Sequence, residues 1–277
     1  MARLTEIGRA APAAQRRSGR PGVAARILSK DNGIRLATLL GILLVWEVVS
    51  RIVRPIIFTS PQRAWDAFWQ MTGDGSLLLA WQETLFVLFA GLSLAAVFGV
   101  TLGILFGRYR TAGDLFEPEI TAVFMTPRIA LLPIISLWLG FGEPAKILIV
   151  FLFSFFEIYF TVRNGVRTVD RDFVEVARAY NVDEQTMLTK VVLPASLPYV
   201  VTGLRLGLLH GMVGVVLVGF FLENNGIGGL IFNYGQNFRI PFLFGALVTV
   251  MVVGMAINVT LRWAERRIAP WRAGASA

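Results

Sequence analysis

The sequence contains no cysteine and only one histidine, His210. Without cysteine the chain has neither a disulfide framework nor a thiolate metal site, and one histidine cannot form a multi-histidine metal centre. The chain also lacks a GxxxxGK[ST] phosphate-binding loop, so we do not expect it to bind ATP itself. With a single histidine, the chain also has few candidates for the general base of a nucleophile–base pair. These absences predict a protein that is not an enzyme and that holds no metal or other cofactor of its own.

Charged residues are scarce as well, at 16% of the 277 residues, whereas soluble domains contain about 25%. Hydrophobic residues make up 55% of the chain, and the mean hydropathy is +0.65. They gather in stretches that, as helices, could each cross roughly 30 Å of hydrocarbon. These stretches are Ile34–Val53, Leu77–Phe106, Leu115–Leu139, Ile147–Val162, Tyr199–Leu222 and Pro241–Trp263. The sequence therefore predicts an all-α membrane protein with about six transmembrane helices.

The two ends of the chain differ from its apolar middle. Residues 1–33 are rich in Ala, Arg and Gly and contain no apolar run, so we expect a basic, disordered tail rather than a cleaved signal peptide. Residues 34–265 form the predicted transmembrane domain, and residues 266–277 form a short C-terminal tail.

Lysine and arginine are distributed unevenly between the predicted loops. With the N-terminus in the cytoplasm, the cytoplasmic segments hold 19 of the 26 Lys and Arg residues, and the opposite side holds 5. The positive-inside rule therefore predicts that both termini and the loop at about 170–195 lie in the cytoplasm. The same rule accounts for the net charge of +8, so nucleic acid is not expected as a partner.

That loop contains the longest polar interval of the chain after the N-terminal tail, and it predicts two short helices. Asp172 with Glu175 resembles a capping box at the start of the first helix, which can end at Asn181 because asparagine tolerates the left-handed conformation. Asp183 can cap a second helix that Pro194 closes. From geometry alone, a plain loop between two membrane helices and a docking element are equally acceptable interpretations.

The order of residues in this loop resembles the EAA loop of ABC importer permeases, whose pattern is EAA, three residues, Gly, nine residues and I-x-L-P. Here Glu175-x-Ala177, Asn181 and Val191-x-Leu193-Pro194 stand at the matching gaps. Val176, Asn181 and Val191 replace Ala, Gly and Ile of the pattern. In that family the loop is the coupling helix, which seats in a groove of the cytoplasmic ATPase subunit. The resemblance implies this role for Asp172, Glu175, Ala177, Arg178, Ala179, Tyr180, Asn181, Val182 and Pro194.

Further motifs in the same order resemble the permeases that import alkanesulfonates, taurine and nitrate, over roughly residues 40 to 265. They lie at residues 127–133, 138–143, 165–170, 203–207 and 224–231. The resemblance implies the type I importer fold, in the bacterial inner membrane. It also implies a dimer of permeases, expected to be a homodimer, two ATP-binding subunits that hydrolyse ATP, and a periplasmic substrate-binding protein.

Polar residues inside the apolar stretches are candidates for a translocation path. An intramembrane charge costs at least about 2.5 kcal/mol unless it faces protein or water. Arg128 stands beside Pro127, and two interpretations stay open: an anion contact on the path, or a salt bridge to Glu157. His210 predicts either an interhelical hydrogen bond or a substrate contact. Glu157, Met212 and Gly219 depart from residues common in the family, so they are also assigned to the path.

The cargo predicted from Arg128 and the family resemblance is a small organic or inorganic anion of the sulfonate, taurine or nitrate type. A neutral vitamin precursor carried by the same machine is the alternative. A stand-alone secondary transporter is a further alternative, but the sequence shows no internal repeat and only one Pro-interrupted stretch.

Small residues recur every four positions in two of the apolar stretches. They are Gly91, Ala95, Gly99, Gly103 and Gly107 in one, and Gly203, Gly207, Gly211 and, three positions on, Gly214 in the other. Such rows let helix backbones approach closely in lipid, so we expect them to be packing surfaces.

Overall fold

The computed structural model describes residues 30–168, 179–222 and 225–268, and it divides the chain into two compact units, Met1–Val49 and Ser50–Ala277. Nearly all of the described part of the first unit is α2 (Lys30–Ile52). Apolar side chains are exposed around α2, among them the consecutive residues Ile42, Leu43, Leu44 and Val45, which point in different directions. A helix that is apolar on every side is typical of a membrane span.

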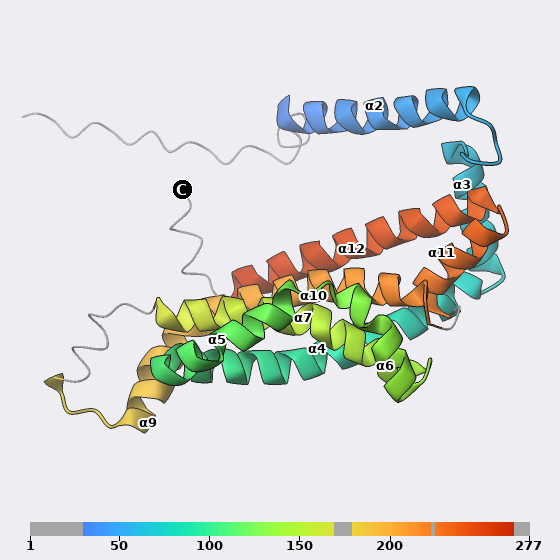
Figure 1. Ribbon diagram of the computed structural model, residues 1–277. Coiled ribbons are helices and arrows are strands. Elements are labelled where there is room, and N and C mark those ends of the chain that lie inside the picture. Colours follow the sequence, from blue (N-terminus) through green and yellow to red (C-terminus); the bar gives the residue numbers. More distant parts are fainter. Residues whose placement is uncertain (1–29, 169–178, 223–224, 269–277) are drawn as a thin grey trace, which may run out of the picture. The chain divides into compact units, whose positions relative to one another are not determined.

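The second unit is helical throughout its described residues, which contain no strand (Figure 1). Its elements are α3 (Pro61–Gly73), α4 (Ser76–Arg108), α5 (Arg110–Met125), η1 (Arg128–Leu131), α6 (Leu132–Leu139), α7 (Glu143–Arg167), α9 (Glu184–Thr186), η2 (Met187–Val192), α10 (Leu193–Gly219), α11 (Gly226–Gln236) and α12 (Ile240–Ile268). Five helical segments of the described chain are long and apolar enough to cross a membrane, in α2, α4, α7, α9–α10 and α12. The bent pair α5–α6 makes a sixth if it is counted as one span, so the predicted all-α membrane fold is confirmed.

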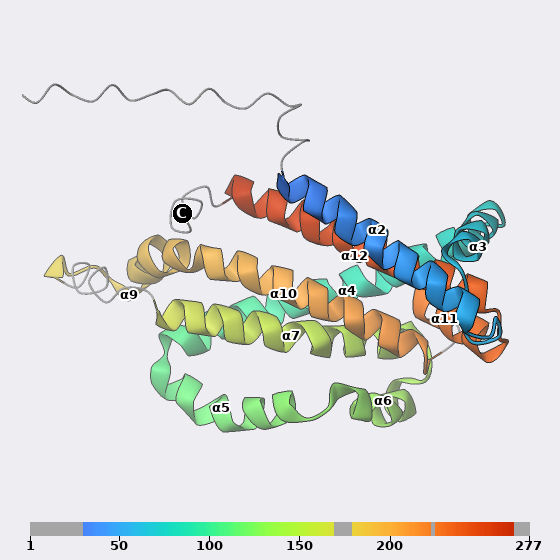
Figure 2. The same ribbon diagram turned by 90° about the horizontal axis from the view of Figure 1, so that it is seen from above.

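Helix α7 packs against both α4 and α10, and Figure 2 shows it between α10 and the α5–α6 pair. The glycine row of α4 faces the β-branched residues of α7: a Cβ added at Gly103 would lie 2.9 Å from Val162 Cβ. The row of α10 faces the other side of α7, where a Cβ at Gly207 would lie 2.6 Å from Ile158 Cγ1. Both rows therefore act as packing surfaces, as predicted, and they hold the three helix backbones in close contact.

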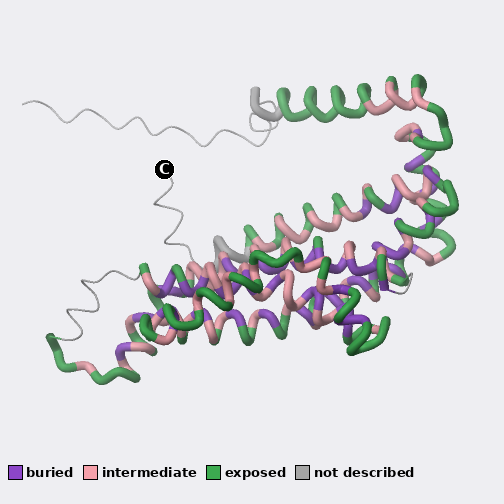
Figure 3. The backbone as a smooth tube through the Cα atoms, in the orientation of Figure 1, coloured by how far each residue is buried: buried purple, intermediate pink, exposed green. Residues whose placement is uncertain are grey.

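Burial follows this arrangement (Figure 3). The fully buried side chains of α7 include Ile149, Ile158 and Val162, whereas α4 and α12 expose apolar residues such as Phe98 and Met251 on their outer sides. Because the chain spans a membrane, these outward apolar side chains are suited to contact with lipid.

Two features of the fold differ from the sequence prediction. The stretch Leu115–Leu139 is not one straight helix: α5 and α6 meet at an angle of 85° around η1. Pro127 lacks a backbone donor and disfavours helical geometry at Thr126, which adopts an extended conformation there. The helices α3 and α11 were not predicted at all, because 13 and 11 residues are too few to register as stretches that cross a membrane.

Alanine at Gly91 is expected to destabilise the protein, whereas alanine at Gly254 is not. A Cβ at Gly91 would lie 2.7 Å from Val150 Cγ1 and 2.9 Å from the Ile147 carbonyl oxygen, but nothing lies within 4 Å of one at Gly254. Both changes stabilise the helix by about 1 kcal/mol because alanine has the higher helix propensity. Only Gly91→Ala also destabilises the protein by roughly 1–3 kcal/mol, because its Cβ overpacks the contact with α7. Thermal unfolding in detergent should show a lower midpoint for Gly91→Ala alone. Equal midpoints for the two variants would show that the α4–α7 contact is loose.

Candidate functional site

The described part of the loop begins at Ala179 and turns sharply at Asn181. Asn181 has a φ of 52°, which confirms the predicted left-handed residue at this helix end. Asp183 then caps α9, as predicted: the Thr186 backbone N–H donates to Asp183 Oδ2 at 3.1 Å. Hydrogen bonds from Thr186 lower the pKa of the Asp183 carboxyl, so the cap is ionised at neutral pH. Asp172, Glu175, Ala177 and Arg178 lie outside the described residues.

Pro194 does not close the second helix, and this prediction was wrong. The chain continues from α9 through a π-helix, Met187–Val192, directly into α10. Pro194 stands in the first turn of α10, and the Leu193 N–H reaches back to the Leu188 carbonyl. Because the helix is continuous here, Pro194 removes a donor that could bond to the preceding turn, and the wider π turn at this place accommodates the missing bond and the proline ring.

Buried side chains and an ion pair attach this segment to the membrane helices. Met187 and Val192 are buried in one apolar cluster with Val162 and Val166 of α7. Arg108, at the end of α4, pairs with Glu184 of α9 at 2.6 Å. Ala179 and Tyr180 are exposed, and Val182 is half-buried. The described segment is therefore attached to the membrane helices on one side and leaves Tyr180 exposed on the other.

Arg128 occupies the break between α5 and α6, and it makes contacts on several sides. Its guanidinium lies 5.0–5.5 Å from the ring centres of Phe124, Phe153 and Phe156. Its Nη1 lies 3.5 Å from the Phe153 carbonyl oxygen, at the limit of a hydrogen bond. Its Nη2 lies 3.7 Å from Glu157 Oε1, so the predicted salt bridge is present as a long ion pair. Cation–π contacts of this kind stabilise a guanidinium that is withdrawn from water.

His210 joins the same cluster from α10. The Leu206 carbonyl oxygen can only accept, so His210 Nδ1, 3.1 Å away, carries a proton and donates it there. The Nε2 atom lies 3.7 Å from Glu157 Oε1. The Glu157 carboxylate thus stands between a guanidinium and an imidazole that come from η1 and α10. The exposed side-chain fractions are 12% for Arg128, 20% for Glu157 and 45% for His210, so none of the three is fully enclosed by this chain.

The other two residues assigned to the path lie elsewhere. Met212 is buried in the apolar core shared by α4, α10, α11 and α12. Gly219 packs against the backbone of α11, where an added Cβ would lie 2.8 Å from Gly228 Cα. The structure thus brings together Arg128, Glu157 and His210 and leaves Met212 and Gly219 apart from them.

Three further ion pairs were missed by the sequence analysis. Arg163, almost fully buried, forms two hydrogen bonds of 2.8 and 2.6 Å to Glu117 of α5. Arg167 pairs with Asp114 in the same helix pair, α5 and α7. At the other end of α7, Lys146 pairs with Glu83 of α4 at 2.8 Å. The available signal was a set of opposite charges at the edges of neighbouring apolar stretches, but the sequence does not show which edges meet.

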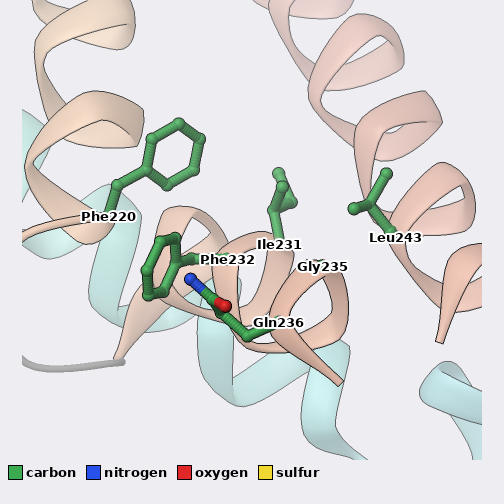
Figure 4. Close-up of a pocket in the computed structure, with 6 residues that line it drawn as sticks. All are labelled: Phe220, Ile231, Phe232, Gly235, Gln236 and Leu243. Carbon is green, nitrogen blue, oxygen red and sulfur yellow. The ribbon is translucent and has the colours of Figure 1, made fainter. Parts of the chain in front are cut away.

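A cavity of about 350 Å³ lies away from these residues, between α10, α11 and α12 (Figure 4). It is lined by Phe220, Ile231, Phe232, Gly235, Gln236 and Leu243. The lining contains no charged group, so this cavity offers no counterpart to the Arg128 cluster.

Comparison with known proteins gives a consistent result. Residues 99–273 match the family model described as binding-protein-dependent transport system inner membrane component. The putative aliphatic sulfonates transport permease SsuC of Bacillus subtilis is 29% identical over 83% of this chain and 84% of its own length. The taurine transport system permease TauC of Escherichia coli is 26% identical over 88% and 91%. The bicarbonate transport system permease CmpB of Synechococcus elongatus is 29% identical over 92% and 96%.

A structural relative supports the same fold. A chain from the inward-facing MetNI methionine ABC transporter matches 68% of this chain and 93% of its own length, with a TM-score of 0.58 and 21% identity. At that identity the likeness concerns the fold alone.

Replacing Asn181 with glycine is expected to leave stability unchanged or to raise it slightly. Glycine adopts the left-handed conformation without the Cβ penalty, which is about 1–2 kcal/mol for an ordinary residue, while its greater freedom in the unfolded chain offsets part of the gain. Asn181→Ala, as the comparison variant, should lower the unfolding midpoint measured in detergent. A clear loss of stability in Asn181→Gly would mean that the asparagine side chain makes a specific contact.

Proposed function

The chain belongs to the family of binding-protein-dependent transport system inner membrane components, the permeases of ABC importers, and from this membership we propose that it imports a small anion. The observation that supports this proposal is the position of Arg128. Its half-buried guanidinium lies at the bend between α5 and α6 and pairs with Glu157. A membrane protein retains such a charge only where water, a carboxylate or a substrate satisfies it. Relatives named for sulfonates, taurine and bicarbonate support this class of cargo.

The transport path, in this proposal, passes Arg128, Glu157 and His210. The guanidinium presents a planar set of donors that can bind an oxyanion through two parallel hydrogen bonds. Because the Arg128–Glu157 contact is long, at 3.7 Å, an entering anion would displace a weak partner rather than a tight one. Phe153, which lies beneath the guanidinium, is seated against Gly214 of α10, so this contact also links the site to the packed helices.

The energy, in this proposal, comes from separate subunits. We infer that two ATP-binding subunits dock on the loop at about 170–195, that a second copy of this chain completes the permease dimer, and that a periplasmic binding protein delivers the solute. The firm attachment of the loop through Met187, Val192 and the Arg108–Glu184 pair supports a coupling role, since a loosely held loop would transmit little. The Lys and Arg distribution supports a bacterial inner membrane orientation with both termini in the cytoplasm.

Removing the Arg128 charge is expected to abolish uptake while leaving membrane insertion and basal ATP hydrolysis largely intact. Loss of a hydrogen bond to a charged group should reduce uptake by at least about tenfold, and Arg128→Lys should restore only part of it because a point charge cannot reproduce the bidentate geometry. The measurement is ATP-driven uptake of an alkanesulfonate, taurine and bicarbonate by the complete complex in proteoliposomes.

The competing account, in which the Arg128–Glu157 pair is only structural, predicts a different pattern. Arg128→Ala would then lower the unfolding midpoint, because it leaves an unpaired carboxylate. The double variant with Glu157→Ala would restore both stability and transport. Recovery of both properties in the double variant would therefore refute the anion contact.

A reversal of charge in the loop is expected to uncouple ATP hydrolysis from transport. In the double variant Glu175→Lys with Ala177→Trp, substrate-stimulated ATP hydrolysis by the assembled complex should fall, because both changes fall on the surface proposed to meet the ATP-binding subunit. Asp66→Lys in α3, an exposed acidic-to-basic change in a different helix, is the control. Unchanged stimulation in the loop variant would contradict the proposed docking surface.

A further inference from the structure

Helix α3 has three distinct faces, although it is only 13 residues long. At about 100° per residue, Ala64, Ala67 and Met71 share one face, Trp65 and Trp69 share a second, and polar residues share the third. The polar face carries Gln62, Arg63, Asp66 and Gln70. A helix that is merely a connector has no need of an exposed aromatic face beside a polar one.

The first face packs α3 firmly onto α12. Ala64, Ala67 and Met71 are at most 4% exposed. Gly245 of α12 provides the room: a Cβ there would lie 3.0 Å from both the Ala64 carbonyl oxygen and Met71 Cε. The orientation of the other two faces is therefore set by close packing rather than by a flexible tether.

The second face is a cluster of three rings that is left open. Trp65 and Phe68 stack with ring centres 5.5 Å apart, and Trp69 meets Trp65 edge-on at 5.6 Å. Trp65 is 57% exposed and Trp69 is 55% exposed. Two tryptophan rings exposed to this extent leave a large apolar surface uncovered unless another surface packs against them.

The chain positions α3 at the boundary of a membrane span. Only Asp74 and Gly75 separate α3 from α4, and Gly75 takes a left-handed φ of 77°, which turns the chain between the two helices. At about 1.5 Å per residue, 13 residues measure roughly 20 Å, too short to cross the hydrocarbon. Helix α3 is therefore not a span of its own, and it adjoins the end at which α4 begins.

A second aromatic group lies at the same end of the unit. Helices α3 and α6 both lie near the end where α4 begins and α11 is found (Figures 1 and 2). Trp138, in the last turn of α6, is 74% exposed, and Phe141 just beyond it is 63% exposed. Exposed aromatic residues on separate elements toward one end of a membrane protein are typical of the lipid–water boundary.

We propose that α3 is an interfacial helix that binds the phospholipid headgroup region through Trp65 and Trp69. Its aromatic face enters the boundary between headgroups and acyl chains, its polar face remains in water, and its third face transmits this position to α12. Tryptophan is suited to this place because its ring is apolar while its indole N–H can donate to lipid oxygens. A protein partner would need only one patch, whereas the aromatic residues here are divided between α3 and α6.

The absence of cysteine makes a direct test possible, since an introduced cysteine is the only one in the chain. Trp65→Cys and Trp69→Cys probe the aromatic face, and Asp66→Cys and Gln70→Cys, on the polar face of the same helix, are the matched controls. Each variant is labelled with a nitroxide and reconstituted as the full complex, with any partner cysteines removed, in phosphatidylethanolamine–phosphatidylglycerol vesicles. Relaxation is then measured with oxygen, which partitions into lipid, and with a water-soluble nickel chelate.

The expected result is a severalfold higher ratio of oxygen to nickel accessibility at 65 and 69 than at 66 and 70. Equal ratios at all four positions would overturn the proposal. Low accessibility to both reagents at 65 and 69 would also overturn it, because a protein surface then covers the rings. Because labelling removes the tryptophans, quenching by brominated phospholipid is measured on the unlabelled chain as well. The double variant Trp65→Phe with Trp69→Phe should lose a strongly quenched fraction of the fluorescence, and an unchanged quenched fraction would count against lipid contact.

Discussion

The close approach of α7 to α4 and α10 is the constraint on which the rest of the structure depends. Lipid offers no hydrophobic driving force between helices, so the three helices are held by dispersion contacts that only short backbone separations allow. The two glycine rows provide those separations, and β-branched residues of α7 fill the space. Since both sides of α7 are occupied in this way, its remaining face carries Glu157 and Arg163 toward η1 and α5. The position of Glu157 in the candidate site thus follows from the packing of α7 against α4 and α10.

Much of the fold could be predicted because hydropathy and charge act locally. The spans α2, α4, α7, α10 and α12 follow from long apolar runs, and the glycine rows identified the contact faces of α4 and α10. Helices α3 and α11 were not predicted because they are too short, at 13 and 11 residues, to appear as membrane-crossing apolar runs. The 85° bend between α5 and α6 was not predicted, although Pro127 interrupts this stretch, because its geometry depends on contacts with α7 that no local pattern encodes.

The features of the candidate site that depend on neighbouring residues were predicted, whereas most contacts between distant helices were not. The left-handed Asn181 and the Asp183 cap depend on neighbouring backbone groups, and both are confirmed. The pairing of Arg128 with Glu157 was one of two interpretations, since two intramembrane charges of opposite sign have few alternatives. The approach of His210 to Glu157 and the Arg163–Glu117 pair join helices far apart in the chain, and the register between such helices cannot be read from a sequence. Met212 and Gly219 show the same difficulty, because their helix was known but their face was not.

The π-helix at Met187–Val192 has a geometric consequence for everything that precedes it. A π turn accommodates one residue more than an α turn, so residues before it are rotated by about 100° relative to a continuous α-helix. With a regular helix at this place, Glu184 would point away from Arg108 and the direction in which Tyr180 is presented would change by the same angle. The extra residue of the π turn therefore determines the direction in which the loop faces around the axis of α10. Insertion or deletion of a single residue in this segment would therefore rotate the surface of the preceding loop without changing any of its side chains.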